Sequence, residues 1–116
     1  MAAEPLRSLP HHGETRTMSE LLTPDDFSPH VNKVFRVRDG RHGLVLTAVE
    51  QRRLEPWETE MALREPFNLI FRGPPDDLLP QGLYTLDVEG GPAFELYVIP
   101  IHTQARDRQN YQAAFN

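Results

Sequence analysis

Few of the residue types that carry out catalysis occur in this chain in a usable pattern. It has no cysteine, which excludes a thiolate nucleophile, a disulfide and a zinc site ligated by cysteine. Its serines, Ser8, Ser19 and Ser28, precede the segments expected to form a sheet, and no Gly-x-Ser-x-Gly motif is present. The sequence therefore offers no serine or cysteine nucleophile for acyl transfer.

The sequence also offers only weak candidates for metal ligands. None of the five histidines has the His-x-x-x-His spacing that places two imidazoles on one helix face. The acidic pairs Asp25-Asp26 and Asp76-Asp77 are better explained by helix-start and turn roles, because neighbours in sequence do not face each other. We expect no metal, no cofactor and no catalytic residue.

Arg72 is the strongest candidate for ligand binding. It ends an apolar segment and precedes a Gly-Pro pair, so its guanidinium could form a forked pair with a carboxylate or bind loop carbonyls. As a ligand anchor it would act with Tyr84 and Phe94 at the mouth of a barrel that holds an anionic small molecule. As a structural residue it would tie the loop over residues 73–82 to the sheet, and we favour this second role.

Trp57 is the strongest candidate for contact with a protein partner. It lies in a charged connection, residues 51–66, and is flanked by Arg52, Arg53 and Met61. Exposed aromatic and arginine side chains commonly anchor protein interfaces. We therefore expect a partner at this connection.

A strip of basic residues offers a second candidate site for an anion. It consists of Lys33, Arg36, Arg38 and Arg41 on the first predicted hairpin. We favour the interpretation that these side chains are the solvated face of an edge hairpin, where charge discourages aggregation.

The elements that position these residues follow from apolar periodicity. Alternation with period two predicts strands over residues 33–38, 44–50, 67–72, 83–88, 93–101 and 110–116. An Asp-Gly turn at residues 39–43 joins the first two, and Leu44, Leu46 and Ala48 are expected to point inward. The fifth strand is apolar on both faces, which predicts a central strand covered on both sides by the N-terminal helix or a subunit partner.

Before the strands, the chain predicts a tail and a short helix. Residues 1–18 lack apolar periodicity and are expected to be disordered or loosely ordered, and Met18 is an alternative start. Within 19–27, Thr23 suits a helix cap and Pro24 the first helical position. Residues 19–116 are expected to form one domain.

The predicted fold class is all-β. Short strands joined by tight turns leave no room for crossover helices, which excludes a doubly wound parallel sheet. A small barrel and a sandwich remain as alternatives. We favour a partly closed antiparallel β-barrel of about six strands with a short N-terminal helix, because one layer hides its apolar face only by curling or by pairing with a second copy.

Four motifs give the chain a family resemblance. They are a strand ending in Phe-Arg-Gly-Pro (71–74), Leu-Pro-Gln-Gly-x-Tyr (79–84), a strand ending in Pro-Ile (100–101), and Tyr-x-Ala-x-Phe-Asn (111–116). In this order they resemble a family of small uncharacterised bacterial domains, over roughly residues 23–116. The resemblance implies no activity, and it implies the company of phage-tail-like or fibre proteins.

Charge and hydropathy limit the classes of partner. A net charge of −5 argues against binding to nucleic acid, which depends on a field of Lys and Arg. No secretory signal or membrane-spanning apolar stretch is visible, so we expect a cytoplasmic protein without membrane contact.

The function favoured by these observations is a non-enzymatic structural or interaction module that binds a protein partner or itself, for example as a homodimer. The alternatives are the anionic-ligand barrel and an enzyme that uses His102 with a carboxylate such as Glu95.

Overall fold

The computed structural model describes residues 15–17, 20–51, 55–59 and 66–115 of the chain. Most of the expected tail, the alternative start Met18 and the candidate contacts Arg52 and Arg53 lie outside these ranges. The tail's last residues, Thr15–Arg16, form a strand, β1.

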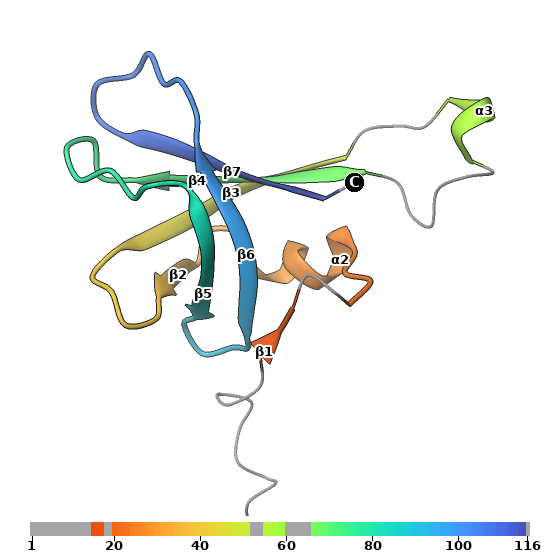
Figure 1. Ribbon diagram of the computed structural model, residues 1–116, viewed down its shortest axis with the longest axis horizontal. Helices are drawn as coiled ribbons and strands as arrows, with labels where there is room; N and C mark the ends of the chain where they lie inside the picture. The colour runs from red at the N-terminus through yellow and green to blue at the C-terminus, as the bar shows by residue number, and fades with distance from the viewer. Residues whose placement is uncertain (1–14, 18–19, 52–54, 60–65, 116) are drawn as a thin grey trace, which may run out of the picture.

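Six antiparallel strands form a closed barrel (Figure 1). They lie in the order β6-β5-β2-β3-β4-β7, and β7 pairs back onto β6. This confirms the predicted all-β class and settles the choice between barrel and sandwich. The strands are β2 (Val34–Val37), β3 (Gly43–Gln51), β4 (Phe67–Gly73), β5 (Gly82–Val88), β6 (Ala93–Pro100) and β7 (Gln109–Phe115).

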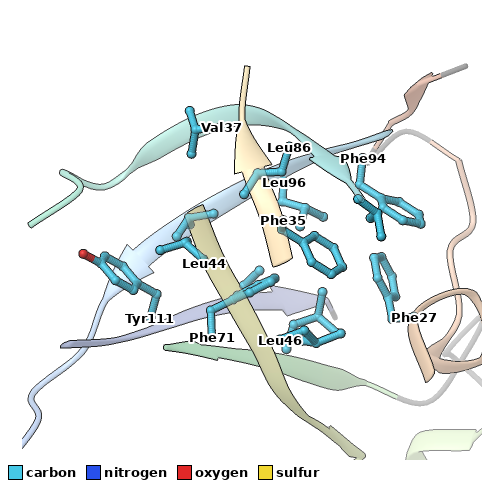
Figure 2. Packing of buried hydrophobic residues seen from close by; sticks show 14 of the residues in the cluster. Phe27, Phe35, Val37, Leu44, Leu46, Phe71, Leu86, Phe94, Leu96 and Tyr111 are labelled. Carbon is cyan, nitrogen blue, oxygen red and sulfur yellow. The ribbon is translucent and has the colours of Figure 1, made fainter. Parts of the chain in front are cut away.

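The barrel interior is filled with side chains (Figure 2). Alternate residues of each strand point inward, as the period-two pattern predicts. Phe67 and Phe115, on neighbouring strands, stack with ring centroids 4.5 Å apart. The largest fully buried side chains are those of Leu22, Phe27, Phe35, Leu44, Leu46, Phe67, Leu69, Phe71, Leu86, Phe94, Leu96 and Tyr111.

The first predicted hairpin, β2–β3, is present, but its second strand departs from strict alternation. Leu44 and Leu46 are buried as expected. A bulge between Leu46 and Ala48 then shifts the register, so that Ala48 pairs with Ile70 and Val49 with the buried Leu69. Val49 therefore packs on the core, and the prediction that Ala48 points inward is wrong.

The N-terminal helix does not cover the outer face of β6, so this part of the prediction is wrong, and cover by a subunit partner stays a prediction. β6 is central in its pairing, because β5 lies on one side and β7 and β1 share the other. Its inward residues Leu96 and Val98 are buried, whereas Tyr97 on the outer face is 39% exposed. Apolar residues on both faces of this strand thus mark a surface that the domain itself leaves uncovered.

A short N-terminal helix packs against one end of the barrel. Helix α2 (Pro24–Phe27) starts at the predicted cap, where Asp26 accepts a 2.7 Å hydrogen bond from the backbone N–H of Thr23. A 3-10 turn, η2 (Ser28–His30), follows. Phe27 is fully buried, and its ring contacts Phe94 with centroids 4.5 Å apart. The helix therefore closes this end of the barrel.

The connection between β3 and β4 carries one more helical turn, α3 (Pro56–Thr59). This turn is drawn away from the barrel in Figure 1. No helix among the described residues is long and apolar enough to span a bilayer.

Candidate functional site

The loop between β4 and β5 closes the end of the barrel opposite α2. Leu79 is buried there, and its backbone N–H donates a 2.9 Å hydrogen bond to the hydroxyl of Tyr111. The hydroxyl of Tyr84 donates a 2.6 Å bond to the carbonyl of Pro80. Figure 2 shows Phe27 and Tyr111 at opposite sides of the buried cluster. Tyr84, a candidate ligand contact, thus binds the barrel's own loop.

Two residues of the β2–β3 turn, Arg41 and His42, contact the carboxylate of Asp77 in the same loop. The guanidinium of Arg41 donates bonds of 2.6 and 3.1 Å to Asp77. The ring Nε2 of His42 lies 3.3 Å from the Asp77 carboxylate. The Arg41 hydrogen bonds hold the pKa of Asp77 below its usual value. Arg41 and His42 therefore play the tethering role that the sequence analysis assigned to Arg72.

Arg72 itself lies on the outer face of the barrel. Its neighbours along β4, Phe71 and Gly73, are buried, so its side chain points outward and is exposed. No ion-pair or side-chain hydrogen-bond partner for its guanidinium is found in the described part of the chain. The Arg72 guanidinium thus faces solvent and forms no side-chain contact that stabilises the described part of the fold.

The three residues proposed to line a ligand-binding mouth do not converge. Tyr84 is near the start of β5 and contacts the β4–β5 loop. Phe94 is near the start of β6, against Phe27 at the other end. Arg72 points away from the interior. This arrangement does not favour the anionic small-ligand barrel.

The basic strip on the first hairpin divides into paired and unpaired residues. Arg38 forms a forked pair with Asp87 on β5, at 2.5 and 3.2 Å, and Arg41 is held by Asp77. Within the described ranges Arg36 and Lys33 have no ion pair. Sequence spacing alone could not separate these residues, because the carboxylates come from segments 36 and 49 residues away.

Trp57 is 74% exposed in α3, more than any other large hydrophobic residue that the structure describes. The neighbouring candidates Arg52 and Arg53 lie outside the described residues. The sequence analysis missed a further exposed hydrophobic site. Leu83 on β5 and Tyr97 on β6 are cross-strand neighbours on the outer face, and they are 56% and 39% exposed. The sequence could have indicated this site, because Leu83 and Tyr97 alternate with the inward-pointing residues of their strands and are therefore expected on the outer face.

His30 is a partly buried titratable residue. Its ring packs edge-on against Phe35 and Phe94, at 6.3 and 6.0 Å between centroids. Its Nδ1 is buried without a hydrogen-bond partner among the described residues. Burial, with a smaller contribution from the charge of Lys33, lowers the pKa of His30.

The acid–base pair considered for an enzyme is not assembled. Glu95 points outward on β6, opposite Thr85, and His102 lies beyond the end of that strand. The five residue steps from Glu95 to Pro100 alone extend about 16 Å, at roughly 3.3 Å per residue. Across residues 15–17, 20–51, 55–59 and 66–115, no group of three or more His, Cys, Asp or Glu side chains could hold a metal ion.

One family model matches the chain. It is described as "Domain of unknown function (DUF6916)", and the match covers residues 22–115, from the buried Leu22 to the end of β7. A search of curated proteins and a search of solved structures found no match.

Proposed function

We propose that this chain, which belongs to the family described as Domain of unknown function (DUF6916), is a non-enzymatic protein-interaction module. The observation that carries the proposal is the exposure of Trp57, at 74%, on a helical turn set off from a filled barrel. Indole burial is among the largest single contributions to protein interfaces. The barrel then serves as a rigid support for this contact.

Two further features support binding rather than small-molecule chemistry. Both barrel ends are closed by the chain itself, by Phe27 at one end and by Leu79 at the other. Functional sites for small molecules are usually concave. Leu83 and Tyr97 instead lie side by side on the outer surface of β5 and β6, where contact with another macromolecule would cover both. Assemblies of the phage-tail-like or fibre kind are the first context in which to seek the partner.

The test is capture from source cells. The tagged chain is cross-linked in vivo and recovered proteins are quantified for the wild type, Trp57→Ala and Leu21→Ala. Leu21 is the matched control, because it is 55% exposed and lies on a different segment. We expect a stoichiometric partner whose recovery falls at least about tenfold in Trp57→Ala, since an interface tryptophan contributes about 2 kcal/mol or more, and is retained in Leu21→Ala.

Sedimentation of the purified protein distinguishes self-association from binding to a different protein. A dimer that Trp57→Ala dissociates would identify a second copy as the partner. A monomer at all concentrations, with no protein recovered from cells, would contradict the proposal. Consumption of a small molecule from a metabolite extract would contradict its non-enzymatic part.

A further inference from the structure

We infer that the outer face of β2, β3 and β4 binds an acidic, extended segment of a partner protein through Arg36 and Arg72. This inference rests on the proposed function and names the chemistry of one partner contact. It concerns one surface, the arginine face, defined by the outward residues Val34, Arg36, Gly43, Val45, Arg72 and Asn110.

The register of the strands places the two arginines on either side of β3. Arg36 pairs with Gly43, and Arg72 pairs with Val45, two residues further along the same strand. Both arginine side chains are exposed. Neighbouring strands lie about 4.8 Å apart, so the two backbones are separated laterally by about 10 Å.

Gly43 lets one of the two guanidinium groups lie across the strand. A Cβ built on Gly43 would be 3.6 Å from Nη1 of Arg36 and 3.2 Å from a methyl group of Val34. The Arg36 guanidinium therefore lies over the β3 backbone and toward the side on which Arg72 stands. Between the two cations the surface is formed by Val34 and Val45, both partly exposed.

The charge on this face is unbalanced. The chain has 17 acidic and 12 basic residues, and none of the six residues that define the arginine face is acidic, but Asp87 and Glu89 border it on the β5 side, next to Arg36 and Val34. The carboxylate across from Arg36, Asp87, accepts both of its bonds from Arg38. Elsewhere on the same surface Arg41 has a carboxylate of its own. Two cations beside an apolar strip therefore complement carboxylates that come from outside the chain.

The shape of the face identifies the class of occupant. An outward sheet surface has no concavity to enclose a small anion, and two arginines do not form the cationic field that a nucleic-acid backbone requires. An extended peptide places alternate side chains about 7 Å apart on one side. Carboxylates at positions i and i+4 of such a peptide, about 14 Å apart, can reach both guanidiniums, and an apolar side chain at i+2 on the same side covers Val34 and Val45.

The test uses two labelled peptides and the full chain. Acetyl-Glu-Thr-Val-Thr-Glu-amide, which places both carboxylates and the valine on one side, and its Gln counterpart carry the same dye, and binding is followed by fluorescence anisotropy at low salt. We expect the Glu peptide to bind at least about tenfold more tightly, because charge-assisted hydrogen bonds are about twice as strong as neutral ones. Arg36→Gln and Arg72→Gln should each weaken its binding about three- to tenfold.

Arg106→Gln is the matched control, because Arg106 is exposed in the β6–β7 loop and is unpaired in the part of the chain that the structure describes. It removes the same charge and should change affinity by less than about twofold. Arg72→Lys should be intermediate, since lysine keeps the charge but not the fork.

Several results would overturn the inference. They are equal binding of the two peptides, an equal loss in Arg106→Gln, no binding of the Glu peptide, or tighter binding of a single-stranded oligonucleotide of the same charge. If the peptide result is negative while capture still depends on Trp57, the arginine face is wrong and the interaction module stands.

Discussion

The hydroxyl of Tyr111 shows how single polar atoms secure an otherwise apolar barrel. It accepts the backbone N–H of Leu79 in a buried setting. Tyr111→Phe should lower the free energy of unfolding by about 1 to 3 kcal/mol, because the N–H is left buried without a partner. Urea unfolding measures this difference.

Tyr84→Phe is the matched control, since its hydrogen bond to Pro80 is exposed. It should cost less than about 1 kcal/mol. A larger loss in Tyr84→Phe than in Tyr111→Phe would contradict the assignment.

His30 should make the stability depend on pH in the mildly acidic range. Its pKa is lowered in the folded protein, so the unfolded chain takes up a proton first as the pH falls below about 6.5. The His30 contribution is complete above that pH and is lost progressively toward the lowered folded pKa. Unfolding midpoints in urea from pH 7.5 to 5 should fall in the wild type.

His30→Phe should flatten this dependence, because the titrating ring is removed from its contact with Phe35 and Phe94. His102→Gln is the control and should keep the wild-type profile, since His102 is exposed. Profiles of equal slope in the wild type and His30→Phe would show that other groups are responsible.

At the scale of single residues, the sequence could identify candidate site residues but not the residues with which they form ion pairs or hydrogen bonds. Trp57 was predictable as exposed because it lies in a charged connection bounded by prolines. The separation of Arg36 and Arg72 from Arg38 and Arg41 was not, because it depends on where Asp77 and Asp87 arrive in three dimensions. Tyr84 was considered as a ligand contact, and its hydrogen bond to the carbonyl of Pro80 could not be predicted because it depends on the conformation of the β4–β5 loop.

Among the elements, α2 acts as a plug for one barrel end. Phe27 is buried and its ring contacts Phe67, Phe94 and Phe115. Phe27→Ala should lower the free energy of unfolding by about 3 to 5 kcal/mol, since it removes a large side chain and leaves a cavity. Chemical denaturation followed by circular dichroism measures the loss.

Leu21→Ala, on the same segment but at an exposed position, should change stability by less than about 0.5 kcal/mol. Similar effects of the two substitutions would mean that α2 is not packed as described.

The strands were largely predictable and their irregularities were not. Phe67, Leu69 and Phe71 alternate along β4 with Asn68, Ile70 and Arg72, and all three are buried as expected. The bulge in β3 shifts Ala48 out of phase, and it depends on pairing with β4 rather than on any residue type in β3. The apolar outer face of β6 was interpreted as covered by the N-terminal helix or a subunit partner, and composition could not decide between them, because both leave the same apolar pattern in the strand.

At the scale of the whole molecule, the barrel is closed by its least extensive pairing. β6 and β7 pair through Ile99 with Gln112 and Pro100 with Tyr111, and an additional bond joins Ile101 to Asn110. The earlier part of the same β6 edge pairs with β1, at Thr15 and Arg16. Because this seam holds few backbone hydrogen bonds, its amides should exchange with solvent deuterium before those of the longer β3–β4 and β4–β7 pairings.

The position of the single tryptophan determines what the protein's intrinsic emission reports. Because Trp57 already faces water in the folded state, its emission maximum should shift by only a few nanometres when the barrel unfolds, while the tyrosine signal changes. Docking of a partner on the indole would instead move the emission to shorter wavelength. The fluorescence of Trp57 therefore reports whether a partner covers this residue, and titration with a candidate partner needs no added label.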